Sequence, residues 1–92
     1  MASLADIESG ANAIKARVYA LAGWKANFLP WSDYEAGSRI VLGTFDQGKA
    51  VADCGQALYD TIAKAGYGSQ VNVEQCTDVA QHCLETVGRI KP

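Results

Sequence analysis

The sequence lacks several features that would assign it to a class at once. It has no continuous apolar run of membrane-spanning length and no basic start, so we expect neither a signal peptide nor a membrane segment. Its three cysteines are an odd number without regular spacing, which favours buried thiols in a reducing compartment over a disulfide framework. These absences predict a cytoplasmic protein.

The chain also has little net charge and no internal repeat. Its formal charge is -2 and its isoelectric point is near 5.1, which argues against bulk attraction to duplex DNA or to an anionic membrane. Its 92 residues are enough for one domain with a thin hydrophobic core. We therefore expect a single domain over residues 1–92.

Three segments have the apolar period of an amphipathic helix. The first covers about 3–22 and begins at Ser3, a residue type suited to an N-cap. The second covers about 48–65, and the third covers about 73–87. The third follows Asn72, which stands three residues before a glutamine in a capping-box pattern. A glycine follows each of the three segments and predicts its end.

Two other segments alternate in the manner of β-strands. Residues 24–29 place mainly aromatic side chains on one face and polar ones on the other, whereas residues 39–45 alternate with mostly apolar side chains on both faces. We predict an antiparallel hairpin, with Pro30 ending its first strand and a connector over 30–38. Residues 70–73 also alternate and could form a third short strand. The expected fold is therefore α+β, in the order α-β-β-α-(β)-α.

Catalytic and metal-binding patterns have little support. Cys54, Cys76, His82 and Cys83 have the composition of a zinc site, but seven residues of helix separate Cys76 from Cys83 by about 10.5 Å of rise. His82 falls on the polar face of its helix, and no nucleophile elbow, phosphate loop or metal motif accompanies it. We expect no metal, no cofactor and no enzymatic activity, with a hydrolase that uses His82 as an alternative.

Two groups of residues are candidate binding sites. The first is basic and would hold a phosphate backbone or an acidic groove, although the same charges could simply be scattered for solubility. The second is aromatic and acidic and lies on the predicted connector, where it would contact an Arg/Lys-rich partner or fold back onto the sheet. The basic group is Lys15, Arg17, Lys25 and Arg39, and the aromatic-acidic group is Trp31, Asp33, Tyr34 and Glu35.

The predicted first helix carries a third surface of interest, opposite its apolar stripe. Its residues are small rather than charged, which either reflects the helix propensity of alanine or allows a partner to approach closely. The strip consists of Ala5, Ser9, Ala16 and Ala20.

A short acidic chain that displays these basic and aromatic-acidic groups resembles the phage-encoded anti-CRISPR proteins, with the type I-F group as one candidate. The resemblance covers the whole chain and has no diagnostic motif. It implies a non-enzymatic inhibitor in the host cytoplasm that docks on Cas proteins of an RNA-guided surveillance complex, contacts guide-RNA phosphates and blocks target DNA. It implies no membrane and no small-molecule substrate. The alternative is a phage or bacterial structural protein that self-associates through the strip of small residues.

Overall fold

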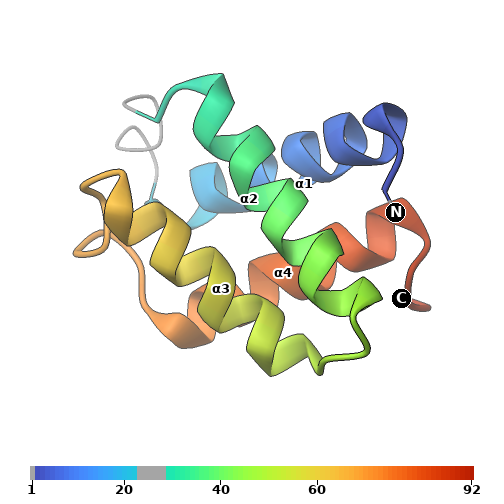
Figure 1. The fold of residues 1–92 in the computed structure, drawn as a ribbon. Coiled ribbons are helices and arrows are strands. Elements are labelled where there is room, and N and C mark those ends of the chain that lie inside the picture. Colours follow the sequence, from blue (N-terminus) through green and yellow to red (C-terminus); the bar gives the residue numbers. More distant parts are fainter. Residues whose placement is uncertain (1, 23–28) are drawn as a thin grey trace.

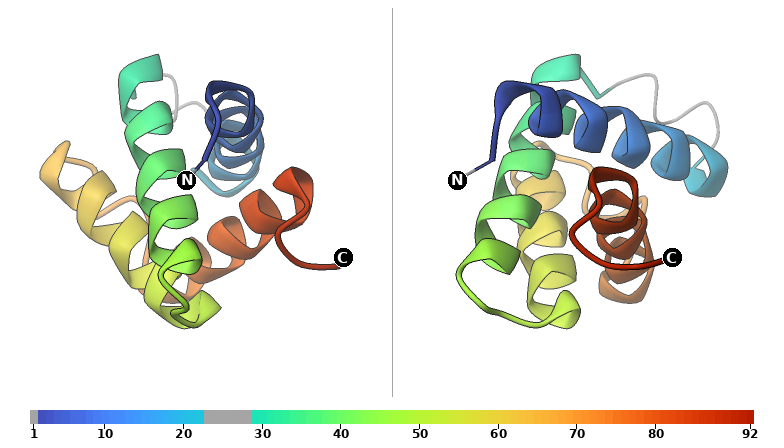
Figure 2. Two further views of the ribbon diagram at one scale, coloured as in Figure 1. Left: turned by 45° about the vertical axis from the view of Figure 1, so that its right-hand side comes forward. Right: turned by 90° about the vertical axis from the view of Figure 1, so that its right-hand side faces the viewer.

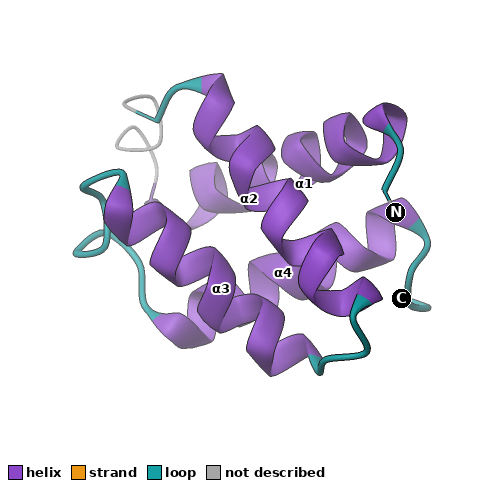
Figure 3. Cartoon of the chain, viewed as in Figure 1, coloured by secondary structure: helices purple, strands orange, loops and turns teal. Residues whose placement is uncertain are grey.

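In a computed structural model, residues 2–22 and 29–92 are described, and they form four α-helices joined by loops (Figure 1). Within these two ranges no residue belongs to a β-strand (Figure 3). The helices are α1 (Leu4–Ala22), α2 (Trp31–Asp46), α3 (Val51–Lys64) and α4 (Val73–Val87).

The four helices pack around one hydrophobic core. Each helix contacts the next one in the chain, α1 closes the ring against α4, and α2 also reaches α4 across the middle. The helices cross rather than align: in the right-hand view of Figure 2, α1 runs across the top of the molecule, above α4, which is seen nearly end-on. The buried core side chains are Ile7, Ala11, Ile14, Val18, Leu29, Tyr34, Val41, Leu42, Cys54, Leu58, Ile62, Val71, Cys76, Val79, Ala80, Cys83 and Leu84.

The α+β prediction is wrong, because the segment predicted as the second strand lies inside α2. Residues 39–45 are helical, and Pro30 is the N-cap residue that precedes the first turn of this helix rather than the end of a strand. Most of the other predicted strand, residues 24–28, lies outside the described residues. The possible third strand over 70–73 does not form either, because Asn72 is the N-cap of α4.

The helical period of α2 explains the error. Its buried side chains include Tyr34, Ser38, Val41 and Leu42, with Phe45 packed against the core, and this spacing places them on one face of a helix. The same segment also contains the β-branched residues Ile40, Val41 and Thr44, a residue type enriched in strands. Local sequence allows either a helix or a strand over residues 39–45, and packing against α1 and α3 selects the helix.

The other helices agree closely with the predicted segments. The Ser3 hydroxyl accepts a hydrogen bond from the Asp6 amide at 3.1 Å and caps α1. At the start of α4, the Gln75 amide donates to Asn72 Oδ1 at 2.8 Å, and the Asn72 amide donates to Gln75 Oε1 at 3.0 Å. The predicted capping box is therefore confirmed, as is the end of α4 at Gly88, which has a φ of 83°.

The apolar stripe of α1 is only partly buried. Ile7, Ile14 and Val18 lie in the core, as the stripe predicts, but Leu4 and Leu21 are 78% and 45% exposed. These two residues lie at opposite ends of a helix of 19 residues, where the stripe continues past the helices that cover its centre.

A glycine marks the closest approach between two helices. A Cβ atom added at Gly55 of α3 would lie 2.5 Å from the Thr77 Cα atom of α4, which is backbone and cannot rotate away. Only a residue without a side chain allows α3 and α4 to pack at this distance.

Candidate functional site

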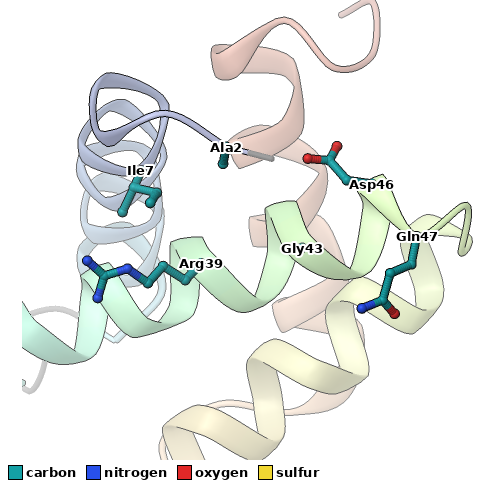
Figure 4. Close-up of a pocket in the computed structure, with 6 residues that line it drawn as sticks. All are labelled: Ala2, Ile7, Arg39, Gly43, Asp46 and Gln47. Atoms are coloured by element: carbon teal, nitrogen blue, oxygen red, sulfur yellow. The ribbon is translucent and has the colours of Figure 1, made fainter.

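A hollow of about 380 Å³ opens on the surface between the start of α1 and the second half of α2 (Figure 4). Ile7 and Arg39 lie at one end of it, and Asp46 lies at the other (Figure 4). Ile7 is only 9% exposed, so it belongs to the core as well as to this surface. The residues that line the hollow are Ala2, Ile7, Arg39, Gly43, Asp46 and Gln47.

The two ends of the hollow differ in charge. Arg39 is exposed and forms no ion pair or hydrogen bond with any residue that the structure describes. Asp46 is bound by Arg89, whose Nε and Nη2 atoms donate to its two carboxylate oxygens at 3.0 and 3.3 Å. Arg89 also donates to Asp6 at 3.3 Å. The cation at one end is therefore available, whereas the carboxylates at the other share a cation.

The pKa values at the second end follow from this ion pair. The hydrogen bond from Arg89 lowers the pKa of the Asp46 carboxyl, and the same bond raises the pKa of the Arg89 guanidinium. Asp46 and Arg89 therefore both carry full charge at neutral pH. Their contact joins α2 to the segment that follows α4.

Gly43 lines the hollow without contributing a side chain. A Cβ atom added there would have no heavy atom within 4 Å, and its backbone is helical, without a positive φ. Nothing in the packing of the described residues therefore requires a glycine at this position. Gly43 differs in this respect from Gly55, which α4 holds closely.

Trp31 lies on the side of α2 that leads to the hollow. It is followed at four-residue steps by Glu35, Arg39 and Gly43, which form a ridge that turns by about 40° around the helix axis at each step. Trp31 is 39% exposed, and its ring stands between the Lys15 ammonium group at 5.9 Å and the Tyr34 ring at 6.4 Å. We call Trp31, Glu35, Arg39 and Gly43 the α2 ridge.

The exposed large apolar side chains of the described residues gather on two helices. Of six such side chains, five belong to α1 and α2, which adjoin in the fold. Those of α1 and α2 are Leu4, Tyr19, Leu21, Trp31 and Ile40, and the sixth is Val73 at the start of α4.

The structure distributes the predicted basic group over different surroundings. Lys15 contacts Trp31 of α2, and Arg39 lines the hollow. Arg17 faces α4 instead, with its Nη2 atom 3.5 Å from His82 Nδ1. Lys25 lies outside the described residues. Lys15 and Arg39 are thus associated with the α1–α2 side, and Arg17 with the α1–α4 side.

The aromatic-acidic group lies in the first turn of α2, not on a hairpin loop. Tyr34 is buried, and burial, followed by the charge of Asp33, raises the pKa of its hydroxyl. Asp33 and Glu35 are half-buried, and Asp33 is placed where the helix dipole favours an anion. Tyr34 therefore belongs to the core, whereas Trp31 reaches the surface.

His82 lies at a second, polar hollow between α1 and α4. Its five lining residues include Arg17 and His82, but no serine, threonine or cysteine that could act as a nucleophile beside the imidazole. The other three are Asp78, Gln81 and Glu85, polar residues of α4, in agreement with the predicted polar face. Within the described residues, no group of histidine, cysteine and acidic side chains is arranged to hold a metal ion.

The three thiols are free and buried, which confirms their predicted place in the core. Burial raises the pKa of Cys76 and of Cys83 to about 11. Beside Cys83, the fully buried Ser38 hydroxyl also adjoins Gly10, and it forms no hydrogen bond of acceptable geometry with any described residue.

Sequence reasoning missed most of the hollow. The sequence predicts Arg39 as a binding residue, but on a strand, and it predicts no function for the other lining residues, which are Ala2, Ile7, Gly43, Asp46 and Gln47. The sequence contains one signal for the hollow. Gly43 stands inside a segment whose apolar spacing also fits a helix, and a glycine inside a helix usually has a packing or functional reason.

No described helix combines the length and the hydropathy that a bilayer crossing requires. Comparison with protein-family models, with curated proteins and with solved structures finds no match to this chain, so the assignment of function depends on the geometry above.

Proposed function

We propose that this protein is a small, non-enzymatic binding protein that acts by occupying a surface of a larger partner. The observation that carries the proposal is Trp31, a large aromatic side chain that remains 39% exposed in a domain with a thin core. Tryptophan and tyrosine are strongly enriched among the residues that dominate binding energy at protein interfaces.

Trp31 is also held in place before any partner arrives. The Lys15 ammonium group lies over its ring, and the Tyr34 ring packs against it at a tilt of 51°. An anchor that is already ordered loses less conformational freedom on binding, which favours affinity. The α2 ridge, which starts at Trp31, adds the exposed guanidinium of Arg39 and the uncontacted Gly43.

The partner that the sequence resemblance suggests is a type I CRISPR surveillance complex, whose binding of target DNA the protein would block. Lys15, Arg39 and Trp31 support this proposal, because they combine two cations with an aromatic anchor on the adjoining helices α1 and α2. The hairpin loop on which part of the resemblance depended is absent, because those residues start α2.

The direct test is co-purification with a type I-F complex, followed by competition with target DNA. We expect a stable complex that captures less DNA, and Trp31→Ala should weaken it by at least about tenfold. Val73→Ala is the matched control, because Val73 has a similar exposed fraction, 37%, but lies on α4. A lack of complex, or unaltered DNA capture, would rule out this partner, and equal effects of both substitutions would rule out Trp31 as the anchor.

Self-association through α1 is a second candidate function. Leu4, Tyr19 and Leu21 are 78%, 49% and 45% exposed on this helix, and the strip of Ala5, Ser9, Ala16 and Ala20 is exposed as well. Sedimentation equilibrium should then show a homo-oligomer that Tyr19→Lys dissociates while the fold persists. A monomer at high concentration would exclude this function.

A further inference from the structure

Gly43 lies in helix α2, and no contact within the described chain requires a glycine there. Glycine in a helix interior is less stable than alanine by about 1 kcal/mol, and Gly43 lies four residues before Gln47, the C-cap of α2. A methyl group there would meet open space, so the fold itself gives no steric reason for this cost. A close approach by something outside the chain would give one.

The chemistry around Gly43 indicates what could approach. The adjoining part of the hollow is apolar, since Ile7 and Ala2 line it, and Ile7 is continuous with the core. Arg39, one helical turn before Gly43, is an exposed guanidinium without a partner among the described residues. A ligand that fits both features has an aliphatic group for the hollow and an anion for the guanidinium.

We propose that the hollow at Gly43 binds an acidic aliphatic segment of a partner protein. An aliphatic side chain of the segment packs on Gly43 and Ile7, and a neighbouring carboxylate accepts hydrogen bonds from Arg39. This inference rests on the proposed binding function and names the chemistry of the partner. Trp31, about 18 Å away along the helix axis and about a third of a turn around it, would contact a separate part of the partner.

The charges at the hollow favour an acidic peptide over a nucleic acid. At the far end, Asp6 and Asp46 both contact Arg89, so among the described residues this end presents carboxylates and an already paired cation. A run of phosphates would lie near these carboxylates as well as near Arg39, whereas one carboxylate beside an aliphatic group would not.

A second copy of the chain fits this hollow poorly. A two-fold interface places the same patch on both sides, so each Arg39 would face either its own copy or the partner's carboxylate end, where Asp6 and Asp46 already contact Arg89. Like charges disfavour the first arrangement, and in the second the carboxylates are already paired. We therefore take a different protein as the occupant.

The test is selection of a displayed random peptide library on the intact immobilised protein. We expect enriched sequences in which Asp or Glu stands beside Leu, Ile, Val or Met. A fluorescent copy of the enriched peptide should bind Gly43→Leu at least about tenfold more weakly, because the new side chain fills the hollow. Reselection on Arg39→Glu should replace the acidic residues by Lys or Arg.

Two matched variants control for general effects of the substitutions. Ala52→Leu adds the same side chain to an exposed position of α3, and Lys64→Glu makes the same charge reversal in its last turn. Both should bind the enriched peptide within about twofold of the natural protein. Circular dichroism and unfolding midpoints of all four variants separate lost binding from lost folding.

The outcomes distinguish the two proposals. An absence of any enriched peptide would overturn this inference, whereas the binding function would fail only if co-purification also finds no complex. Enrichment of basic or purely aromatic peptides, or of peptides that bind Gly43→Leu and Arg39→Glu normally, would leave a binding protein but overturn the hollow as its acidic-segment site. Oligonucleotide binding or peptide-free self-association that Gly43→Leu abolishes would assign the hollow to another occupant.

Discussion

Gly55 and Gly43 are both helical glycines, but they lie in opposite surroundings. Gly55 faces the Thr77 backbone across the α3–α4 contact, whereas Gly43 faces an open hollow beside α1. The first glycine permits two helices of the same chain to approach closely. The comparison teaches that the α3–α4 side of the molecule is closed by its own packing. The α1–α2 side also has a helical glycine, but no other part of the described chain packs against it.

The largest effect on stability should come from adding a side chain at Gly55, in the closed α3–α4 contact. Gly55→Ala places a methyl group 2.5 Å from Thr77 Cα, so α3 and α4 must separate. Overpacking of this kind costs about 1–3 kcal/mol, and the backbone contact puts the expected loss in unfolding free energy near the middle of that range. Urea denaturation followed by circular dichroism measures it. An unchanged or higher stability would show that the α3–α4 contact is looser than described.

A substitution on the buried face of α2 should have the opposite effect and raise stability. Ser38 is fully buried with no hydrogen-bond partner among the described residues, and an unsatisfied buried hydroxyl costs about 1–3 kcal/mol. Ser38→Ala should therefore raise the free energy of unfolding by about 1 kcal/mol. Ser9→Ala, at an exposed position of α1, measures the gain in helix propensity alone. Equal gains for the two substitutions would contradict the assignment of an unsatisfied hydroxyl.

Gly43→Ala sharpens the comparison directly, because it is the same substitution as at Gly55. With no atom in the way, alanine should raise stability by about 0.5–1 kcal/mol through helix propensity. The two alanine variants should thus shift the urea midpoint in opposite directions. A loss of stability at Gly43 would mean that the hollow is occupied by part of the chain in solution.

The smallest effect concerns the charged end of the hollow. Because Arg89 lowers the folded-state pKa of Asp46, their contact stabilises the protein at neutral pH. That contribution should be lost as the pH falls below the ordinary aspartate range, about 3.9, and through the lower folded value. It should be less than about 1 kcal/mol, because the pair is partly exposed.

Unfolding curves of Asp46→Asn at several pH values test this contribution. The variant should be slightly less stable than the natural protein at pH 7 and should equal it in acid. Asp78→Asn, at an exposed position that forms no ion pair with Arg89, should show neither effect. A difference that persists at the lowest pH would exclude the carboxylate as its cause.

Sequence patterns predicted three of the helices because their signals are local. Asn72 and Gln75 form their capping box within one turn, and Ser3 caps α1 in the same way. The burial of Cys54, Leu58 and Ile62 likewise follows from the spacing of one helix. Such features depend on neighbours three or four residues away, which the sequence shows directly.

The second helix and the hollow could not be obtained in this way. In α2, Ile40, Val41 and Thr44 favour a strand by propensity, and only contacts with α1 and α3 select the helix. The hollow joins Ile7 to Arg39 and Gly43, whose separation in sequence is bridged by the packing of α1 on α2. Its existence depends on tertiary structure, so the sequence alone indicates at most an unexplained glycine.

The measurement that tests the central claim most directly compares stability and binding of Gly43→Leu in the same preparation. If the glycine is kept open for a partner, the variant should be at least as stable to urea as the natural protein and should bind the selected acidic peptide at least about tenfold more weakly. Unchanged binding, or a binding loss that merely accompanies a loss of stability, would contradict the claim.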